Sequence, residues 1–378
     1  MLNAYRGCPN PSTVHHDEVG DTRATVLIPT INNPNELRVV LERLLQDSDG
    51  SYDIKVIDSS SNQETSELCS ELGVQRIADS SRTRADACNN GLSEVQTPYT
   101  LFTDDDVIPP SKWVKRLTRW FDNENVAGVG GTNFAPDEDP WLSKCTDVAF
   151  GARIMTAGTR YGARPDAELV EVTHNPGVNV AYRTEVLREV GGFDEGAIGA
   201  EDVLLDSKIV SAGHRLFLDP SCTMPHRRRP ALIPMMKQIR NYGYVRRLAI
   251  DREPSLRSPT HRAVQMFPLA VVIASLALAY GVANGGAQWE FWFTLEGEWD
   301  ASRASFHFSL GAISLYLLVC VLGAALGTSP HRSVSTVLAS CITIPAAHLA
   351  YGWGMMKAEW GLLVGSISIT AIDDKERS

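Results

Sequence analysis

Hydrophobic residues follow two alternating patterns along the first 220 residues, and the alternation predicts a layered α/β structure. Short apolar runs at 24–29, 54–58, 74–78 and 99–103 are each followed by a stretch with apolar residues at helical spacing or by a turn. Trp113 in the helix after the fourth run is expected in the core, a further strand is predicted at 126–130, and residues 130–133 are expected to form a turn. Strands that alternate with helices pair in parallel, with helices on both faces of the sheet. Ligands of such sheets bind beyond the carboxyl ends of the strands.

Beyond residue 261 the pattern changes to long stretches that are almost free of charge. Residues 264–283 and 306–327 are long enough to cross a hydrocarbon layer of roughly 30 Å at about 1.5 Å per helical residue. Residues 333–354 form a more polar third candidate, which contains Pro345 and His348. The C-terminal part is therefore predicted to hold about three transmembrane helices.

A basic strip separates these two parts. Residues 221–262 hold ten Lys and Arg against two acidic residues, a net charge of +8 in a chain of −10. Within the strip, residues 230–250 carry apolar side chains at three-residue intervals beside several cations, which is typical of a helix in a membrane interface. Its position next to apolar spans predicts contact with anionic phospholipid. A basic helix that covers the soluble domain is the alternative.

Charge placement also predicts an orientation for the apolar helices. With the basic strip inside, the loop that holds Glu290, Glu296 and Glu298 lies outside, and Arg332 returns inside. Residues 1–20 lack the apolar segment of a signal peptide, and the seven cysteines have no metal-site spacing. We therefore expect a multi-pass protein of the cell membrane, with a cytoplasmic catalytic domain and reduced thiols.

Candidate chemistry is concentrated at the ends of the predicted strands. Three consecutive carboxylates, Asp104, Asp105 and Asp106, follow the fourth apolar run. Adjacent buried like charges are costly, and a divalent cation that also binds phosphate oxygens would neutralise them. A solvated acidic turn is the alternative. Asp58 ends the second predicted strand, and a parallel sheet would bring it to the same edge.

Other candidate residues each have a structural alternative. Arg82 and Arg84 precede a predicted helix, where a guanidinium can meet a phosphate or lie on a surface loop. Glu201 and Asp202 open a helix after a glycine-rich loop, so they either complement the helix dipole or present a general base to a cleft. His226 is either a metal ligand or a structural histidine.

The chain has no dinucleotide-binding or P-loop glycine pattern, but a different series of motifs occurs in it. Their joint order resembles the inverting family 2 glycosyltransferases of the GT-A type, over about residues 25–250. The motifs are the strand that ends in Pro29-Thr30, Asp58-Ser59-Ser60-Ser61, Ala87-Cys88-Asn89-Asn90-Gly91-Leu92, the carboxylate triplet, Gly177-Val178-Asn179, Gly191-Gly192-Phe193-Asp194-Glu195 and Glu201-Asp202. The resemblance implies a GT-A nucleotide-diphospho-sugar transferase fold, a Rossmann-like mixed sheet, followed by C-terminal transmembrane helices.

The resemblance also implies roles for the matching residues. The residues that would bind the nucleotide sugar are Pro29, Thr30, Asp58, Arg84, Asp104 and Asp105, with Arg84 at the diphosphate. Gly177 and Asn179 would contact the sugar or the acceptor. Asp106 and His226 would bind a Mg²⁺ or Mn²⁺ ion, and Asp202 would be the general base, with Glu201 beside it. Cys88 stands where many members carry arginine, which puts the role of Arg84 in doubt. Residues 238–242 depart from the processive signature, which favours the addition of one sugar per encounter.

The function implied is inverting transfer of one sugar from a nucleotide-diphosphate sugar to a lipid-linked acceptor, of the polyprenyl or dolichyl phosphate type, or to a glycan. The composition and architecture resemble archaeal enzymes of surface-glycan and N-glycan assembly. The alternative is a non-catalytic nucleotide-sugar-binding membrane scaffold with a degenerate transferase domain. We expect no nucleic-acid partner.

The expected organisation has five parts. They are a polar leader (1–22), a GT-A catalytic domain (23–229), a basic amphipathic interfacial helix (230–260), a transmembrane region (261–356) and a tail (357–378).

Overall fold

The computed structural model describes residues 24–48, 50–156, 169–287 and 300–366, which fall into two compact units. The sheet unit comprises Met1–Phe134 and Ala163–His226, and the helical unit comprises Ala135–Gly162 and Arg227–Ser378. This grouping differs from one continuous catalytic stretch over 23–229, because residues 141–156 form helices that pack with the C-terminal helices. The domain boundaries stay a prediction. The polar leader, the predicted outer acidic residues 290–298 and the end of the tail lie outside the described residues.

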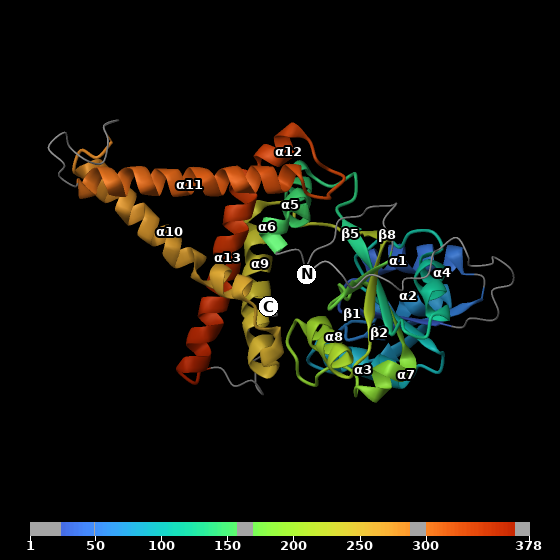
Figure 1. Ribbon diagram of the computed structural model, residues 1–378. Helices are drawn as coiled ribbons and strands as arrows, with labels where there is room; N and C mark the ends of the chain where they lie inside the picture. The colour runs from blue at the N-terminus through green and yellow to red at the C-terminus, as the bar shows by residue number, and fades with distance from the viewer. Residues whose placement is uncertain (1–23, 49, 157–168, 288–299, 367–378) are drawn as a thin grey trace. The chain divides into compact units, whose positions relative to one another are not determined.

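Eight strands form the sheet of the first unit (Figure 1). Their order is β3-β2-β1-β4-β7-β5-β8-β6, and the first four strands are parallel, as the repeated strand and helix pattern predicts. These four are β1 Ala24–Thr30, β2 Tyr52–Asp58, β3 Gln75–Ala78 and β4 Tyr99–Thr103. Thr30 at the end of β1 pairs with Asp58 at the end of β2, so the loops that follow both strands leave the same edge.

The second half of the sheet is mixed, because β7 runs antiparallel to both β4 and β5, and β6 antiparallel to β8. A wholly parallel sheet is therefore wrong for this half, and the mixed sheet implied by the family resemblance is correct. Its strands are β5 Gly128–Phe134, β6 Val170–Val172, β7 Asn179–Arg183 and β8 Leu216–Pro225.

Helices cover the faces of the sheet with the spacing that the sequence predicts. In α1, Pro34–Asp47, the side chains of Leu37, Val40, Leu41 and Leu44 are buried, because positions three and four apart share one face of a helix. The other elements are α2 Glu64–Leu72, α3 Arg84–Ser93, α4 Trp113–Thr118, η2 Arg119–Asp122, α7 Thr184–Glu189 and α8 Glu201–Ser211. Trp113 is part of the core, as expected.

One predicted turn is a strand. Residues 130–133, expected to form a turn because of their two glycines, lie inside β5. A Cβ atom on Gly130 would lie 2.4 Å from Asn175 Oδ1, and one on Gly131 would lie 2.3 Å from Asn179 Nδ2. The glycines therefore permit close packing of buried asparagines against the strand.

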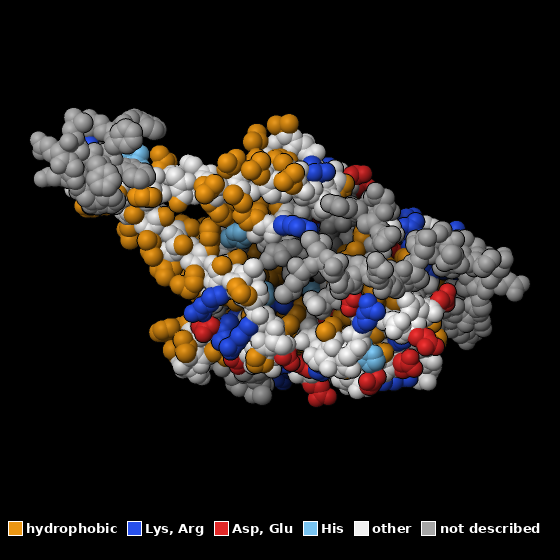
Figure 2. Space-filling view, in the orientation of Figure 1, with side chains coloured by type: hydrophobic (Ala, Val, Ile, Leu, Met, Phe, Trp, Pro, Cys, Tyr) orange, Lys and Arg blue, Asp and Glu red, His pale blue; other side chains and the backbone are white. Residues whose placement is uncertain are grey.

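The helical unit contains three helices long and apolar enough to cross a membrane, at Pro259–Ala283, Ala301–Ala325 and Val334–Leu363. In Figure 2, hydrophobic side chains cover α10 and α11. The elements of this unit are α5 Trp141–Gly151, α6 Arg153–Thr156, α9 Leu232–Arg252, η3 Pro254–Leu256, α10 Pro259–Ala283, α11 Ala301–Ala325, α12 Val334–Leu338 and α13 Ser340–Leu363.

The basic helix α9 exists, and its apolar side chains are divided between exposed and buried positions. Ile233 and Tyr242 are exposed, whereas Met235 and Ile239 are buried. The helix packs along α13, and a Cβ atom on Gly243 would lie 2.1 Å from the Tyr351 carbonyl oxygen. A three-residue interval drifts round a helix of 3.6 residues per turn, so it does not identify one buried face.

Buried polar groups join the segments of the helical unit. Asp147 Oδ1 accepts hydrogen bonds from the Ala135 N–H at 3.0 Å and from Arg228 Nε at 3.2 Å, and its Oδ2 accepts one from the Ser329 hydroxyl at 2.8 Å. Three distant parts of the chain thereby meet at one carboxylate. His348 likewise contacts the Tyr316 hydroxyl and the Ile154 carbonyl oxygen.

Candidate active site

The carboxylate triplet directly follows β4, and β8 brings a histidine beside it. His226 forms an antiparallel bridge with Val107, and its N–H donates to the Phe134 carbonyl. One ligand atom each from Asp104, Asp106 and His226 lie within 4.8 Å of one another, and His226 Nε2 is 3.4 Å from Asp106 Oδ1. The structure thus brings together the two predicted metal ligands and adds Asp104 to them.

The donor set suits a divalent cation. Carboxylate oxygens are the preferred ligands of Mg²⁺, and an imidazole nitrogen is also accepted by Mn²⁺. The buried Nδ1 atom of His226 has no hydrogen-bond partner among the described residues. Two carboxylates and a histidine would supply three ligands to such an ion, and phosphate oxygens or water would supply the others.

Arg84 links the triplet to the acidic pair at the start of α8. Its guanidinium donates one hydrogen bond to Asp104 Oδ1 at 2.6 Å and another to Glu201 Oε1 at 2.9 Å. Burial lowers the pKa of Arg84, but the surrounding carboxylates outweigh it and hold that pKa above its ordinary range. The Arg84 guanidinium therefore lies between two carboxylate groups that are about 100 residues apart in sequence.

Glu201 and Asp202 have environments that separate their proton affinities. Burial raises the pKa of Glu201, and this effect exceeds the opposing effect of Arg84. Burial also raises the pKa of Asp202, but His174, the Gly177 N–H and Arg84 outweigh it, so its pKa lies below the ordinary value. Adjacent carboxylates with divergent pKa values are typical of acid–base sites. Asp202 is the member that is ionised and able to accept a proton.

Gly177 and a second buried carboxylate position Asp202. The Gly177 N–H donates to Asp202 Oδ2 at 3.1 Å, and a Cβ atom on Gly177 would lie 3.2 Å from Asp202 Cβ. His174 Nε2 lies 4.0 Å from the same oxygen, and His174 Nδ1 lies 2.8 Å from Asp206 Oδ2. Sequence reasoning missed His174 and Asp206. The one available signal was the spacing of Asp202 and Asp206, which share a helix face at i and i+4.

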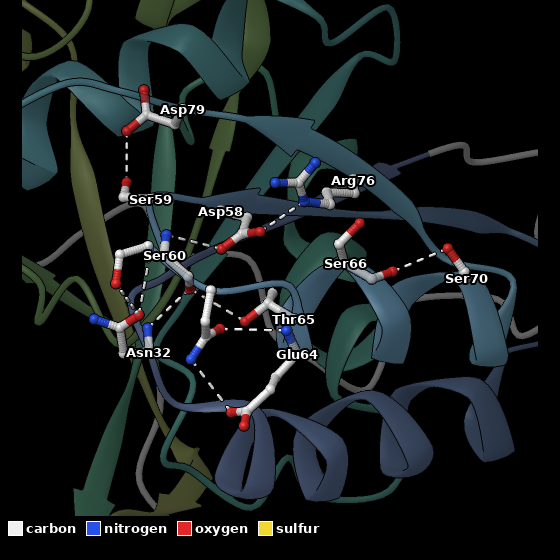
Figure 3. A network of polar contacts seen from close by, with 12 residues as sticks. Asn32, Asp58, Ser59, Ser60, Glu64, Thr65, Ser66, Ser70, Arg76 and Asp79 are labelled. Atoms are coloured by element: carbon white, nitrogen blue, oxygen red, sulfur yellow. Dashed lines mark hydrogen bonds and ion pairs between the residues drawn. The ribbon is translucent and has the colours of Figure 1, made fainter.

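Figure 3 shows the loops after β1 and β2 fastened to each other. The Asn32 N–H donates to the Ser60 hydroxyl at 2.8 Å, and Asn32 Oδ1 accepts from the Ser61 N–H at 3.1 Å. Asp58 lies beneath these loops, where it accepts from the Ser60 N–H at 2.9 Å and from Arg76 Nε at 2.6 Å. Its side chain is fully buried, so Asp58 shapes this loop and does not itself reach the surface.

Thr30 ties the end of β1 to the triplet. Its hydroxyl donates to Asp105 Oδ2 at 2.6 Å, and Pro29 lies one position earlier on the strand. Burial raises the pKa of Asp105 to about 6, against the effect of hydrogen bonds from Thr30 and Asn33. Thr30, Asp105 and Arg84 therefore occupy one polar edge.

Asn179 is placed differently from the other predicted site residues. It is fully buried, accepts from the Trp113 indole N–H at 2.7 Å, and donates to the carbonyls of Thr132 and Cys222 at 2.9 and 3.0 Å. A side chain with these partners holds strands together and is not open to a sugar. Cys88 is also buried, and burial raises the pKa of its thiol to about 12.

Comparison with known proteins gives the family of one domain. Residues 25–191, which include β1 to β7 and the carboxylate triplet, match glycosyl transferase family 2. The protein is a glycosyltransferase that contains this domain. Its match ends before Glu201, so the acidic pair of the enzyme rests on the geometry described above.

Relatives of the enzyme are named as glycosyltransferases or as a protein of succinoglycan biosynthesis. It is 23% identical to the succinoglycan biosynthesis protein ExoA of Rhizobium meliloti, over 71% of this chain and 81% of that protein. It is also 23% identical to the glycosyltransferase AglE of Haloferax volcanii, over 60% of this chain and 75% of that one. A pre-mycofactocin glycosyltransferase of Mycobacterium tuberculosis is 27% identical over 68% of this chain, which spans 53% of that protein.

The fold of the enzyme is the expected GT-A fold. The mannosyltransferase PcManGT from Pyrobaculum calidifontis, solved in complex with GDP-Man and Mn²⁺, matches with a TM-score of 0.51 and 19% identity. The match covers 86% of this chain and 87% of that one.

Proposed function

We propose that the enzyme transfers one sugar, with inversion, from a nucleotide-diphosphate sugar to a lipid-linked or glycan acceptor. The observation that carries the proposal is the placement of Arg84 between Asp104 and Glu201. The carboxylate triplet, which would bind the cation, and the acidic pair that contains Asp202, which would accept the proton, would then lie on the two sides of one guanidinium.

The donor side of the proposal rests on the polar edge after β1, β2 and β4. Pro29, Thr30 and the loop supported by Asp58 would hold the nucleoside, with Asp104 and Asp105 beside it. Arg84 would exchange a carboxylate for a diphosphate oxygen, since a guanidinium binds either anion with paired hydrogen bonds. Mannosyltransferase PcManGT, which has this fold, was solved with such a donor.

Asp106, His226 and Asp104 would hold Mg²⁺ or Mn²⁺. When bound, the ion stabilises the negative charge that develops on the departing nucleoside diphosphate. The protein contributes the arrangement of three ligands and the neighbouring Arg84, which adds a fixed positive charge at the same place.

Asp202 would remove the proton of the acceptor hydroxyl as its oxygen attacks the anomeric carbon. Attack opposite to the leaving group inverts that carbon, so no covalent enzyme intermediate is needed. Gly177 would keep Asp202 in place through its N–H, and Glu201 would position Arg84.

The acceptor side of the proposal rests on the three apolar helices and the basic strip. Helices that cross the membrane, with the basic strip toward anionic lipid, would place the enzyme at the cytoplasmic face of the cell membrane. Confinement to that surface raises the effective concentration of a lipid-borne acceptor. A glucosyl-dolichyl phosphate glucuronosyltransferase of Haloferax volcanii is 26% identical over 24% of this chain, which supports an acceptor of this class.

The test uses the full chain in detergent with a panel of nucleotide sugars, with Mn²⁺ or with chelator. Donor hydrolysis or binding should occur with one nucleotide class and should fall at least tenfold in chelator. Asp202→Asn should lower the rate of transfer about 10³-fold while donor binding is kept, because loss of a general base removes a 10²–10⁴-fold contribution. Unchanged transfer by this variant would overturn the assignment of the base.

A non-catalytic scaffold is not favoured. Such a protein would bind nucleotide sugar but would show no transfer, whether or not Asp202 is replaced.

A further inference from the structure

The apolar helix α13 differs from the other two helices that are long enough to cross a membrane. In the stretch Val334–Leu363, which contains α13, 44% of the most apolar part is buried by the rest of the helical unit. The corresponding shares are 6% for α10 and 17% for α11. Length and composition make all three helices candidates for crossing, so the packing of α13 has to decide its place.

The basic helix α9 packs beside α13 and runs in the same direction. Near the start of both helices, Met235 of α9 and Ala346 of α13 belong to one apolar cluster. Near their ends, Arg247 of α9 pairs with Glu359 of α13. The two helices therefore stay together over about 18 Å, at 1.5 Å per residue.

This packing limits the depth that α13 can reach in a membrane. Between these two contacts, α9 carries Lys237, Arg240 and Arg246, and Lys237 is exposed. Cationic side chains are costly in the hydrocarbon layer but are favourable on a helix that lies in the interface beside lipid phosphates. If α13 crossed the membrane, it would carry the middle of α9 through the hydrocarbon. A position of α9 in the interface therefore holds α13 there as well.

Contacts of α13 with the other two apolar helices lie at one level. His348 contacts the Phe267 ring, with 5.5 Å between the ring centroids, and the Tyr316 hydroxyl at 2.8 Å. Farther along α13, Glu359 accepts a hydrogen bond from Gln265 at 3.4 Å. Phe267 and Gln265 lie in the first ten residues of α10, and Tyr316 lies in the last ten of α11. α13 therefore crosses α10 near its start and α11 near its end.

The opposite ends of α10 and α11 pack against each other. A Cβ atom on Gly281 would lie 2.7 Å from Phe306 Cβ, so the two helices form an antiparallel hairpin. Leu276 of α10 and Phe308 of α11 are 66% and 56% exposed. In Figure 1, α10 and α11 meet at the ends remote from α13, and α13 runs across them near their other ends. A third crossing helix would instead run along the length of this hairpin.

The exposed face of α13 is typical of the boundary between membrane and water. Trp353 and Trp360 are 58% and 68% exposed and lie two helical turns apart on one face. Lys357, which lies between them in sequence, is also exposed. Tryptophan is enriched at the level of the lipid headgroups, and lysine extends from there to phosphate. This face therefore suits the headgroup and upper acyl region of a phospholipid layer.

We propose that α13 lies with α9 in the membrane interface and does not cross the membrane. The chain then crosses twice, through α10 and α11, and both of its ends lie on one side. Lys375 and Arg377, near the end of the chain, return to the side of the basic strip, as the distribution of cations in membrane proteins favours. The inference concerns membrane attachment and does not depend on the proposed reaction.

The first experiment locates epitope tags in sealed membrane vesicles of known orientation. Three full-length chains each carry one tag, before Met1, between α10 and α11, or after Ser378, and protease is added from outside. We expect the tags at the two ends to be cut from one side and the tag between α10 and α11 from the other. A tag after Ser378 on the side opposite to Met1 would show an odd number of crossings and would overturn the proposal. All three tags on one side would refute the two crossings, and cleavage of every tag after detergent is the control.

The second experiment measures the depth of α13 in vesicles that contain phospholipids brominated near the headgroup or near the end of the acyl chain. The change in quenched tryptophan fluorescence on Trp353→Phe and on Trp360→Phe reports the depth of each side chain. We expect both to be quenched at least twofold more by shallow than by deep bromine. In a crossing helix the two side chains would differ in depth by about 10 Å, and Trp353 would lie near the bilayer centre. Stronger quenching of Trp353 by deep bromine would therefore contradict the proposal.

Trp113→Phe is the matched control for the quenching experiment. Trp113 is 1% exposed in the core of the sheet unit, so its loss should leave the fluorescence that brominated lipid quenches unchanged. The Tm of each variant shows whether it is folded. Asp202→Asn separates this inference from the proposed function. If that variant has lost transfer while the tags show three crossings, the proposed function stands and this inference fails.

Discussion

Arginine–carboxylate pairs occur in both units, and the comparison between them separates binding from structure. In the sheet unit, the side chains of Arg84, Asp104 and Glu201 are 29%, 32% and 11% exposed. In the helical unit, those of Arg228 and Asp147 are 8% and 2% exposed. A pair that water can reach is able to exchange one partner for a ligand, whereas an enclosed pair can only be broken. An arginine–carboxylate pair can therefore form part of a binding site in the sheet unit, whereas in the helical unit it stabilises the fold.

The largest effect on stability is expected at Asp147, so a variant of this residue is the strongest test of the comparison. Asp147→Ala leaves the buried Arg228 charge and the Ser329 hydroxyl without their carboxylate partner. The free energy of unfolding should fall by about 3–5 kcal/mol, as for other buried pairs that lose one partner. Thermal unfolding of the full chain in detergent measures it. Glu71→Ala is the control, because it breaks a 2.6 Å ion pair with Arg38 on an exposed surface, and its Tm should stay unchanged. Equal losses for the two variants would remove the distinction.

Arg84 should show the opposite behaviour. Arg84→Gln removes the charge that the proposed function places at the diphosphate, so turnover should fall about 10²-fold, while Tm changes little. Steady-state transfer with the identified donor measures the rate. Arg82→Gln is the matched control, since Arg82 is exposed and lies in the loop two residues before Arg84 opens α3. A large loss of Tm without loss of turnover would make Arg84 a structural residue like Arg228.

A smaller effect on stability is expected at Asp79, a hydrogen-bonded carboxylate in the sheet unit. It accepts hydrogen bonds from Ser59, Ser81 and Asn90. Burial raises its pKa, but these bonds outweigh it and hold the pKa below its ordinary value. The stabilisation is therefore present above the ordinary Asp pKa and is lost as pH falls through the lowered one.

Asp79→Asn should accordingly lower Tm by about 2–4 °C at pH 7, and the difference should shrink below about pH 4. Tm measured across this range checks the sign. Asp53→Asn, at an exposed position on β2, should leave Tm unchanged at every pH. A difference that grows on acidification would contradict the cause given for the lowered pKa.

Local patterns predicted much of both units. The helical spacing in α1 identified the four buried residues of its inner face, and the length of the apolar runs identified the three helices that are able to cross a membrane. A pattern with two meanings failed. The glycines of β5 were interpreted as a turn, although they permit close packing within a strand.

The sequence by itself determined the glycosyltransferase domain, the carboxylates at strand ends and the division into polar and apolar parts, because strand periodicity and helix length are local properties of a chain. Tertiary structure alone decided that Arg84 joins Asp104 to Glu201, that His226 reaches the triplet through Val107, and that His174 and Asp206 stand behind Asp202. It also buried Asn179 and Asp58, which their motifs had marked as ligand contacts. These facts depend on which strands become neighbours, and a chain encodes that choice in the packing of its whole core.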